Sequence, residues 1–173
     1  MKHTISVLVE NHPGVLSKIS GLFSRRAFNI DSLAVGTTED PAVSRVTIVV
    51  NGDEGVVEQV EKQLNKLIDV IKVRALRPGE FISRELMLVK VHANASTRTE
   101  VVQIAEIFGA KIVDVSRTTL TMEVCDQSSQ LVSFLEMMEP YGVRELARTG
   151  TIALERGGGV ARKSAAEEAP PAE

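Results

Sequence analysis

The stretch ISVLVENHPGVLSKISGLFSRRAFNID, residues 5–31, decides the fold of this chain. Apolar residues first stand at alternate positions, at Ile5, Val7 and Val9, which predicts a half-buried strand. Further along, apolar residues recur every three or four positions, which predicts an amphipathic helix with one buried face. The residues of that face are Val15, Leu16, Ile19, Leu22 and Phe23. The turn Glu10-Asn11-His12-Pro13-Gly14 therefore joins a strand to a helix.

This turn has the composition of a binding loop for a small carboxylate. The exposed amides at a helix N-terminus attract anions, and Gly14 has no side chain to keep a ligand away from the backbone. Pro13 suits the first turn of a helix. A simpler interpretation also stands: Asn11 and Gly14 only make a tight connection, and His12 is a solvated turn histidine.

The rest of the chain repeats one order of elements twice. In the first half we expect strands over 3–10, 28–38, 43–50 and 69–77, and helices over 14–26 and 54–67. In the second half we expect strands over 85–93, 111–118, 119–125 and near 143–154, and helices over 97–108 and 127–138. Each half is β-α-β-β-α-β, so the predicted fold class is α+β, with two ferredoxin-like domains in tandem.

The predicted domain boundaries follow changes in composition. We expect a first domain over residues 1–78, a linker over 79–84 after Arg77-Pro78-Gly79, and a second domain over 85–155. Residues 156–173 are rich in Gly, Ala, Glu and Pro and lose apolar periodicity, which predicts a disordered tail.

Composition argues against several classes of protein. The formal net charge is −3 and aromatic residues make up 3% of the chain, which disfavours nucleic-acid binding. No apolar run approaches the roughly 20 residues that cross a bilayer, and the N-terminus lacks the features of a signal peptide. The single Cys125 excludes an internal disulfide and a thiolate metal cluster. We therefore expect a soluble, cytoplasmic protein that contacts neither membranes nor nucleic acids.

Catalytic chemistry is poorly represented. His3, His12 and His92 lie far apart and show no metal-ligand spacing, so no metal site is expected. Cys125 has the character of a packing residue rather than an activated thiolate. Phosphate-binding, dinucleotide-binding and nucleophile-elbow motifs are lacking. The sequence therefore predicts no catalytic residue.

The pattern Asn11-x-x-Gly14-Val15-Leu16 resembles the ligand-binding loop of ACT domains, which sense amino acids in metabolic enzymes. Longer stretches resemble the regulatory (small) subunit of acetolactate synthase, also called acetohydroxyacid synthase. They are LVENHPGVLSKISGLFSRRAFNIDSL, DPAVSRVTIVVNGDEGVVEQVEKQLNKLIDVIKV and the later REL-MLVKV. The similarity spans roughly residues 2–155 and makes the first domain an ACT domain.

The resemblance implies a non-catalytic chain without a cofactor of its own. Its partner would be a catalytic large subunit that carries thiamin diphosphate, Mg²⁺ and FAD and makes acetolactate in branched-chain amino-acid synthesis. This chain would activate that subunit and confer feedback inhibition by a branched-chain amino acid, most often valine. It would form a homodimer through its ACT domains.

In the family, each effector site lies between two ACT domains, with the turn from one protomer and the segment matching Asn29-Ile30 from the other. The expected effector-binding residues are Asn11, His12, Pro13, Gly14, Val15, Leu16, Asn29 and Ile30. The turn amides would hold the effector's carboxylate, while the side-chain carbonyls of Asn11 and Asn29 would accept from its ammonium. A competing interpretation of Asn29 is a left-handed residue at a helix end.

Three other functions compete with this one. The first is a stand-alone amino-acid-sensing ACT protein that regulates a different enzyme. The second is an RNA-recognition module, which shares the element order but needs aromatic residues that strand 43–50 lacks. The third is a small independent enzyme, which the catalytic inventory disfavours.

Overall fold

Two similar α/β units make up the chain, of which the computed structural model describes residues 1–158. The first unit is Met1–Ile82 together with the segment that begins at Ala153, and the second is Ser83–Ile152. The part of the predicted tail at 159–173 lies outside the described residues. None of the helices within residues 1–158 has the length and hydropathy needed to cross a bilayer.

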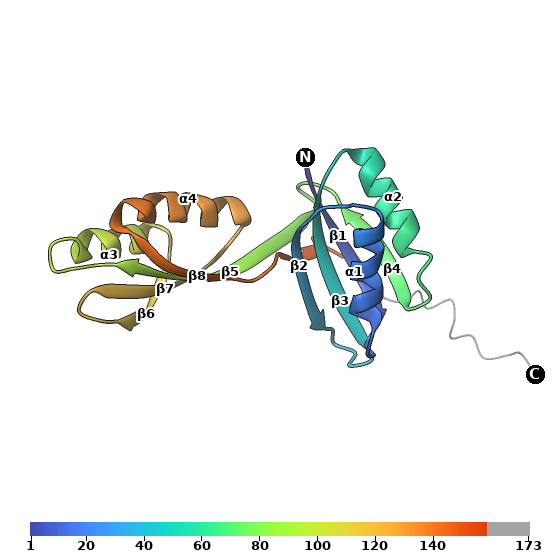
Figure 1. Cartoon of the computed structure of the whole chain (residues 1–173), viewed down its shortest axis with the longest axis horizontal. Coiled ribbons are helices and arrows are strands. Elements are labelled where there is room, and N and C mark those ends of the chain that lie inside the picture. Colours follow the sequence, from blue (N-terminus) through green and yellow to red (C-terminus); the bar gives the residue numbers. More distant parts are fainter. Residues whose placement is uncertain (159–173) are drawn as a thin grey trace, which may run out of the picture. The chain divides into compact units, whose positions relative to one another are not determined.

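The first unit is a four-stranded antiparallel sheet with two helices on one face (Figure 1). Its sheet order is β2-β3-β1-β4, which places β1 and β3 at the centre and β2 and β4 at the edges. The elements are β1 (Lys2–Glu10), α1 (Val15–Arg25), β2 (Ile30–Thr37), β3 (Val43–Asn51), α2 (Glu54–Leu64) and β4 (Val70–Leu76).

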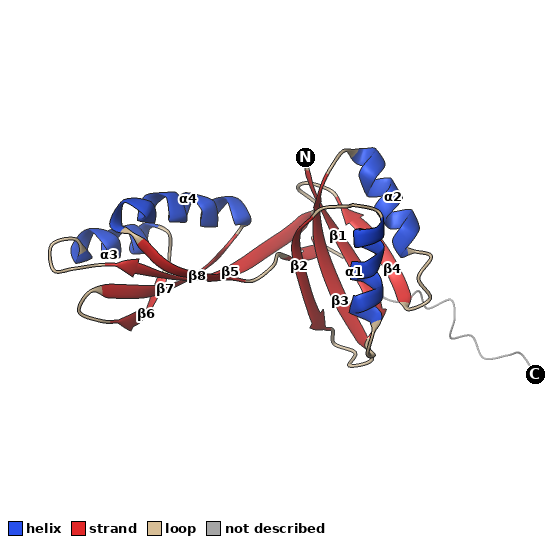
Figure 2. Cartoon of the chain, in the orientation of Figure 1, coloured by secondary structure: helices blue, strands red, loops and turns tan. Residues whose placement is uncertain are grey.

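The second unit repeats this topology, with sheet order β6-β7-β5-β8 and both helices on one face (Figure 2). A further strand, β9, pairs with β5 outside that order. The elements from Phe81 on are β5 (Phe81–His92), α3 (Arg98–Ile107), β6 (Lys111–Val115), β7 (Thr119–Asp126), α4 (Ser128–Met138), the 3-10 turn η1 (Glu139–Tyr141), β8 (Val143–Arg148) and β9 (Ile152–Glu155). The first two residues of β5 and all but the first residue of β9 belong to the first unit. The predicted pair of βαββαβ domains is confirmed.

The core of the first unit lies between its sheet and its helices. Successive strand side chains point to opposite faces, so the alternate residues of β1 and β3 meet the apolar stripes of α1 and α2. Burying a side chain of this size stabilises the fold by roughly 1.5–3 kcal/mol. The fully or nearly fully buried residues of this core are Ile5, Val7, Val9, Val15, Ile19, Leu22, Phe23, Val46, Ile48, Val50, Val57, Val60 and Leu64.

The strand register decides which loops lie at the same end of the sheet. Glu10, the last residue of β1, pairs with Val43, and Thr37, the last residue of β2, pairs with Ser44. Both strands therefore end beside the start of β3. Ile30, the first residue of β2, instead pairs with Val50 near the other end of β3.

Helix α1 ends in a Schellman motif whose left-handed residue is Ala27. Ala27 has φ 55°, its amide donates to the Ser24 carbonyl at 3.3 Å, and the Phe28 amide donates to the Phe23 carbonyl at 3.1 Å. The rings of Phe23 and Phe28 pack edge to face, with centroids 5.9 Å apart. These are the two hydrogen bonds and the apolar contact that define the motif. The left-handed position predicted as one option for Asn29 belongs to Ala27 instead.

The two edges of the first sheet differ in how they are protected. On β4, the backbone amide of Ala75 donates to Oε1 of Glu61, a residue of α2, at 2.9 Å. A carboxylate thus occupies a donor that would otherwise be available to another strand. Nearby, Arg74 forms an ion pair with Glu155. Edge strand β2 carries Val35, whose side chain is 46% exposed.

Several element boundaries differ from the sequence prediction. α2 ends at Leu64 rather than at residue 67, because the chain turns at Asn65 and Leu67 donates to the Leu64 carbonyl. The single strand expected over 143–154 is two strands, β8 and β9, separated by residues 149–151. In this break the backbone amide of Thr149 donates to the Leu86 carbonyl. The expected linker 79–84 is partly strand, because β5 begins at Phe81 and pairs with β9.

We predict that Ala27→Gly stabilises the first unit. A left-handed conformation costs an L-residue roughly 1–2 kcal/mol, and Gly removes this strain while adding some freedom to the unfolded chain. Urea unfolding should show a gain of about 1 kcal/mol. The matched variant Ala34→Gly, in β2, should lose about 0.5–1 kcal/mol, because Gly weakens a strand. A destabilised Ala27→Gly protein would contradict the strain argument.

Candidate functional site

The turn between β1 and α1 presents backbone donors at its surface. Gly14 is the N-cap of α1 with φ 92°, and within residues 1–158 no side chain hydrogen-bonds to cap the helix there. The first amides of a helix lack partners inside the helix and carry its positive dipole end. Apart from Gly14 itself and the residues next to it in the chain, no atom of the described residues lies within 4 Å of the place where a Gly14 Cβ would stand. The turn therefore offers amides and open space to an anion.

Asn11 fastens this turn to the loop between β2 and β3. Its side-chain Nδ2 donates to the Pro41 carbonyl at 2.8 Å, and its backbone amide donates to the Ala42 carbonyl at 2.8 Å. The amide end of the side chain is therefore used within the chain. Its Oδ1 atom is not part of this bond and lies on an exposed residue, where it can accept from a ligand ammonium.

The remaining predicted residues of the turn divide into buried and exposed ones. Val15 is buried in the core and contributes only its backbone. Leu16 is 44% exposed and places apolar surface beside the amides. The Pro13 carbonyl accepts a hydrogen bond from the neighbouring His12 ring.

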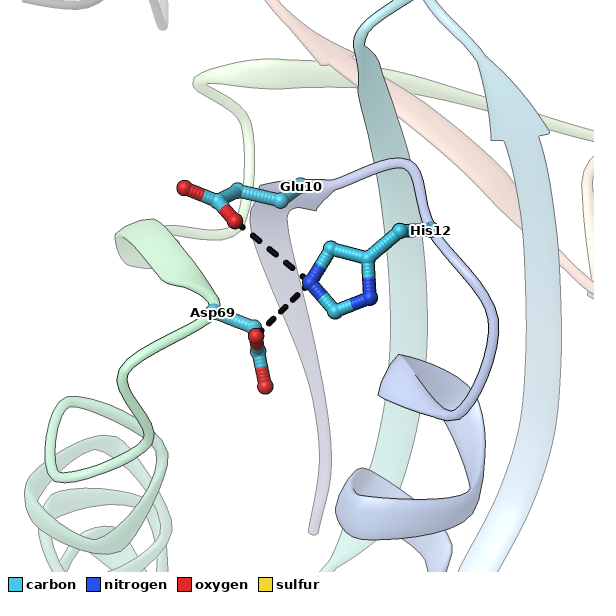
Figure 3. A group of neighbouring side chains, drawn as sticks. All are labelled: Glu10, His12 and Asp69. Atoms are coloured by element: carbon cyan, nitrogen blue, oxygen red, sulfur yellow. Dashed lines mark hydrogen bonds and ion pairs between the residues drawn. The ribbon is translucent and has the colours of Figure 1, made fainter.

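His12 lies in a cluster with Glu10 and Asp69, which Figure 3 shows, and with Lys18. Its Nε2 lies 2.8 Å from Oδ1 of Asp69 and 3.4 Å from Oε2 of Glu10, and its Nδ1 lies 3.1 Å from the Pro13 carbonyl oxygen. The Lys18 ammonium, from α1, lies 2.6 Å from Oδ2 of Asp69. Asp69 is only 5% exposed, so the protein encloses the acid that joins the two cations.

The pKa shifts in this cluster favour charged forms. Hydrogen bonding to the Pro13 carbonyl raises the pKa of His12 above 6.5, and Asp69 and then Glu10 raise it further. The hydrogen bond from Lys18 lowers the pKa of Asp69 below 3.8, with a further contribution from His12. The charges of two carboxylates and two cations then cancel, which compensates for the burial of Asp69 among them.

The same cluster has ligand atoms close enough together for a metal ion. One atom each of Glu10, His12 and Asp69 lies within 4.8 Å of the others. However, the His12 ring directs both nitrogens at acceptors and the Lys18 ammonium already neutralises Asp69. A ligating histidine must present a lone pair. The arrangement therefore fits a protonated histidine better than a metal ligand.

Asn29 and Ile30 lie at the opposite end of α1 from the turn. The helix has 11 residues, so its ends are about 16 Å apart. The side chain of Asn29 donates to Asp31 Oδ1 at 3.1 Å and is exposed. Within one chain the predicted residues thus form two separate groups, Asn11–Leu16 and Asn29-Ile30.

The second unit closes the equivalent turn with its own side chains. Ala93 is the first residue after β5, and its backbone amide donates to the Thr118 carbonyl. In the same way, Asn11 is the first residue after β1, and its backbone amide donates to the Ala42 carbonyl. There the Asn94 side-chain oxygen accepts from the amides of Ser96 and Thr97, at 2.9 and 3.1 Å. The amides of Ser96 and Thr97 are therefore used within the turn and are not open to a ligand.

Sequence reasoning identified the turn but missed Asp69 and Lys18. Lys18 lies on the polar face of α1 and shows no special pattern. Asp69 did leave a signal, because a single acid stands between Leu67-Ile68 and Val70-Ile71. An acid inside an apolar run is rarely buried unless a cation pairs with it.

Comparison with known proteins agrees with this geometry. Residues 5–72 match the family model of the AHAS small subunit-like ACT domain, and residues 84–157 match the model of the small subunit of acetolactate synthase. The first unit is thus an ACT domain, the class indicated by its topology and its turn.

The relatives extend the match over nearly the whole chain. The "Probable acetolactate synthase small subunit" of Archaeoglobus fulgidus is 55% identical over 91% of this chain and 98% of the relative. The acetolactate synthase small subunit of Mycolicibacterium smegmatis is 50% identical over 90% of this chain and 91% of the relative. The crystal structure of the small subunit from Thermotoga maritima aligns with TM-score 0.85 and 41% identity, over 91% and 98%.

The chain belongs to the acetolactate synthase small-subunit family. The resemblance stated from the sequence is confirmed. The role of the chain is that of a regulatory subunit rather than a catalytic one.

The His12–Asp69 pair makes a testable prediction about pH. In an NMR titration the His12 ring should titrate above pH 6.5, and Asp69→Asn should lower its pKa because it removes the carboxylate that stabilises the imidazolium. A raised folded-state pKa gives stability that is complete below 6.5 and lost as pH rises through the folded value. Urea unfolding should therefore show wild-type stability falling over that window, and falling less in Asp69→Asn.

The control is Asp114→Asn, an acid-to-amide change on exposed strand β6. It should leave the His12 titration unchanged. An unaltered His12 pKa in Asp69→Asn would show that the pair does not form in solution.

Proposed function

We propose that this chain activates the catalytic large subunit of acetolactate synthase and makes it sensitive to a branched-chain amino acid, with valine the first candidate. The observation that carries the proposal is the uncapped α1 N-terminus at Gly14, with exposed Leu16 beside it. A free amino acid has a carboxylate for the amides, an ammonium for Asn11 Oδ1, and a side chain for the apolar surface.

The expected affinity suits a cytoplasmic metabolite. Burying a valine side chain is worth roughly 1.5–3 kcal/mol, and two charge-assisted contacts add about 1.5–3 kcal/mol each. Association entropy removes a large part of this sum. Binding in the micromolar-to-millimolar range follows, so the site responds to changes in a metabolite pool.

We propose further that two copies pair their β2 edges to complete the site. Strand β2 ends at the same end of the sheet as the turn, while Ile30 begins at the other end. An antiparallel β2–β2 pair about a two-fold axis lays the start of one β2 beside the end of the other. The second copy's Asn29-Ile30 is then brought to the end of the sheet that carries the turn Asn11–Gly14.

The difference between the edges supports this choice of interface. The Glu61 carboxylate blocks a backbone donor on β4, whereas β2 exposes Val35. An effector held between two copies stabilises the dimer by mass action. It regulates the holoenzyme only if it binds the active and the inhibited conformation with different affinity.

The cofactors belong to the partner in this proposal. Thiamin diphosphate, Mg²⁺ and FAD are assigned to the large subunit, and this chain supplies regulation. Cys125 is exposed and free, which accords with a reducing compartment such as the cytoplasm.

Gly14→Asp should separate activation from sensing. The new carboxylate would stand where the effector's carboxylate binds and repel it. Mixed with an acetolactate synthase large subunit, the variant should still raise activity while valine inhibition falls at least tenfold in potency, the effect of about 1.4 kcal/mol. Enzyme assays with a valine titration check this.

The matched control is Gly79→Asp, another glycine with positive φ (85°) and no atom within 4 Å of an added Cβ. It should keep wild-type valine sensitivity. Retained inhibition in Gly14→Asp would refute the site. If the wild-type chain neither activates the large subunit nor confers a valine response, a stand-alone sensor for a different enzyme becomes the better explanation.

Val35→Lys should weaken the homodimer. Lysine on an edge strand opposes strand pairing because its charge must be desolvated in the interface. Sedimentation velocity should show a higher dimer dissociation constant, by at least tenfold. Ile107→Lys, at a site 79% exposed on α3, is the control and should leave the dimer intact. An unchanged dimer in Val35→Lys would place the interface elsewhere.

A further inference from the structure

We propose that His12 is a positioning residue that fixes the Gly14 amide toward the effector's carboxylate only while the ring is protonated, so that effector binding is linked to pH. The inference rests on the proposed amino-acid site and adds a second input to it. It uses a histidine whose Nε2 meets Asp69 (Figure 3) and whose Nδ1 meets the Pro13 carbonyl oxygen.

The first step is a count of protons on the ring. Nδ1 lies 3.1 Å from the Pro13 carbonyl oxygen and Nε2 lies 2.8 Å from Asp69 Oδ1. Both partners are acceptors, so both hydrogen bonds exist only when the ring carries two N–H groups. A neutral ring has one, and its other nitrogen then directs a lone pair at an oxygen. The Asp69 carboxylate is the stronger acceptor, so a neutral ring keeps its N–H on Asp69, and loss of the proton breaks the bond to the Pro13 carbonyl.

The second step connects Pro13 to the binding amide. The Pro13 carbonyl and the Gly14 N–H belong to one planar trans peptide, so they point in opposite directions. Holding the carbonyl on the His12 ring thus fixes the direction of the Gly14 N–H. Gly14 has φ 92° and open space around it, so this peptide is free to rotate when the ring releases it. The proton on His12 therefore sets one donor of the site.

The third step is the charge around the ring. The ionisable groups that face His12 are Glu10 at the end of β1, Asp69 before β4 and, through Asp69, Lys18 on α1. The two acids favour the imidazolium, and Lys18 keeps Asp69 ionised. Asp69 therefore holds Nε2 of the ring while Nδ1 faces Pro13, and the pKa of His12 is raised above 6.5.

The direction of the pH effect follows. Below the pKa of His12 the amide is held and the effector binds fully. As pH rises through that pKa, affinity falls by up to about tenfold per pH unit, the limit for one linked proton. By linkage, bound effector raises the pKa of His12, so binding at higher pH takes up a proton.

The test is isothermal titration of valine, leucine and isoleucine into the full chain between about pH 6 and 8, which brackets the histidine range. Each pH is measured in two buffers of different ionisation heat, so that the difference gives the protons taken up. We expect affinity to fall with rising pH and up to one proton to be absorbed. In His12→Gln both signals should vanish. In Asp69→Asn the midpoint of the fall in affinity with pH should move to lower pH.

The control is His3→Gln, because the His3 ring hydrogen-bonds to the Gly52 carbonyl near the start of β1 and not to the binding turn. It should keep the wild-type pH dependence. Binding that is equally strong at every pH, or a slope that persists in His12→Gln, would overturn this inference and leave the proposed function standing. No heat with any of the three amino acids at any pH would overturn both.

Discussion

The antiparallel ladder between β1 and β3 is the interaction on which the first unit depends. Its register pairs Ile5 with Ile48 and Val7 with Val46, so one continuous apolar surface faces α1 and α2. A shift of one residue would turn these side chains to the other face. The same register brings the end of β1 to the start of β3, where Asn11 bonds the β2–β3 loop. The packing of the core and the position of the β1–α1 turn therefore have one cause.

The two units show how one topology serves different ends through a few residues. Both units place a turn between their first strand and first helix. In both, a backbone amide of the turn donates a hydrogen bond to a carbonyl in the loop between the second and third strands. In the first unit Gly14 leaves the helix amides open, whereas in the second Asn94 satisfies the turn from within. The proposed effector site therefore lies in the first unit.

Much of the fold, and the position of the β1–α1 turn, could be predicted from the sequence. Periodicity located both βαββαβ units, since alternation and helical spacing report directly on burial. It placed Asn11 and Gly14 correctly in a strand-to-helix turn. It could not find the Schellman end at Ala27, because alanine rarely takes that conformation, nor the pairing of His12 with Asp69, which are 57 residues apart. Contacts of this kind depend on the folded arrangement, which local pattern does not encode.

The guarded β4 edge has a consequence for assembly size. A sheet with two unprotected edge strands can pair with further copies on each side and grow into a fibre. A sheet with one unprotected edge strand can pair with only one other copy, which gives a dimer. The carboxylate of Glu61 on the Ala75 amide makes one border unreceptive. If two copies pair through β2 as proposed, the Glu61 contact disfavours the addition of a third copy at β4, and the assembly stops at two.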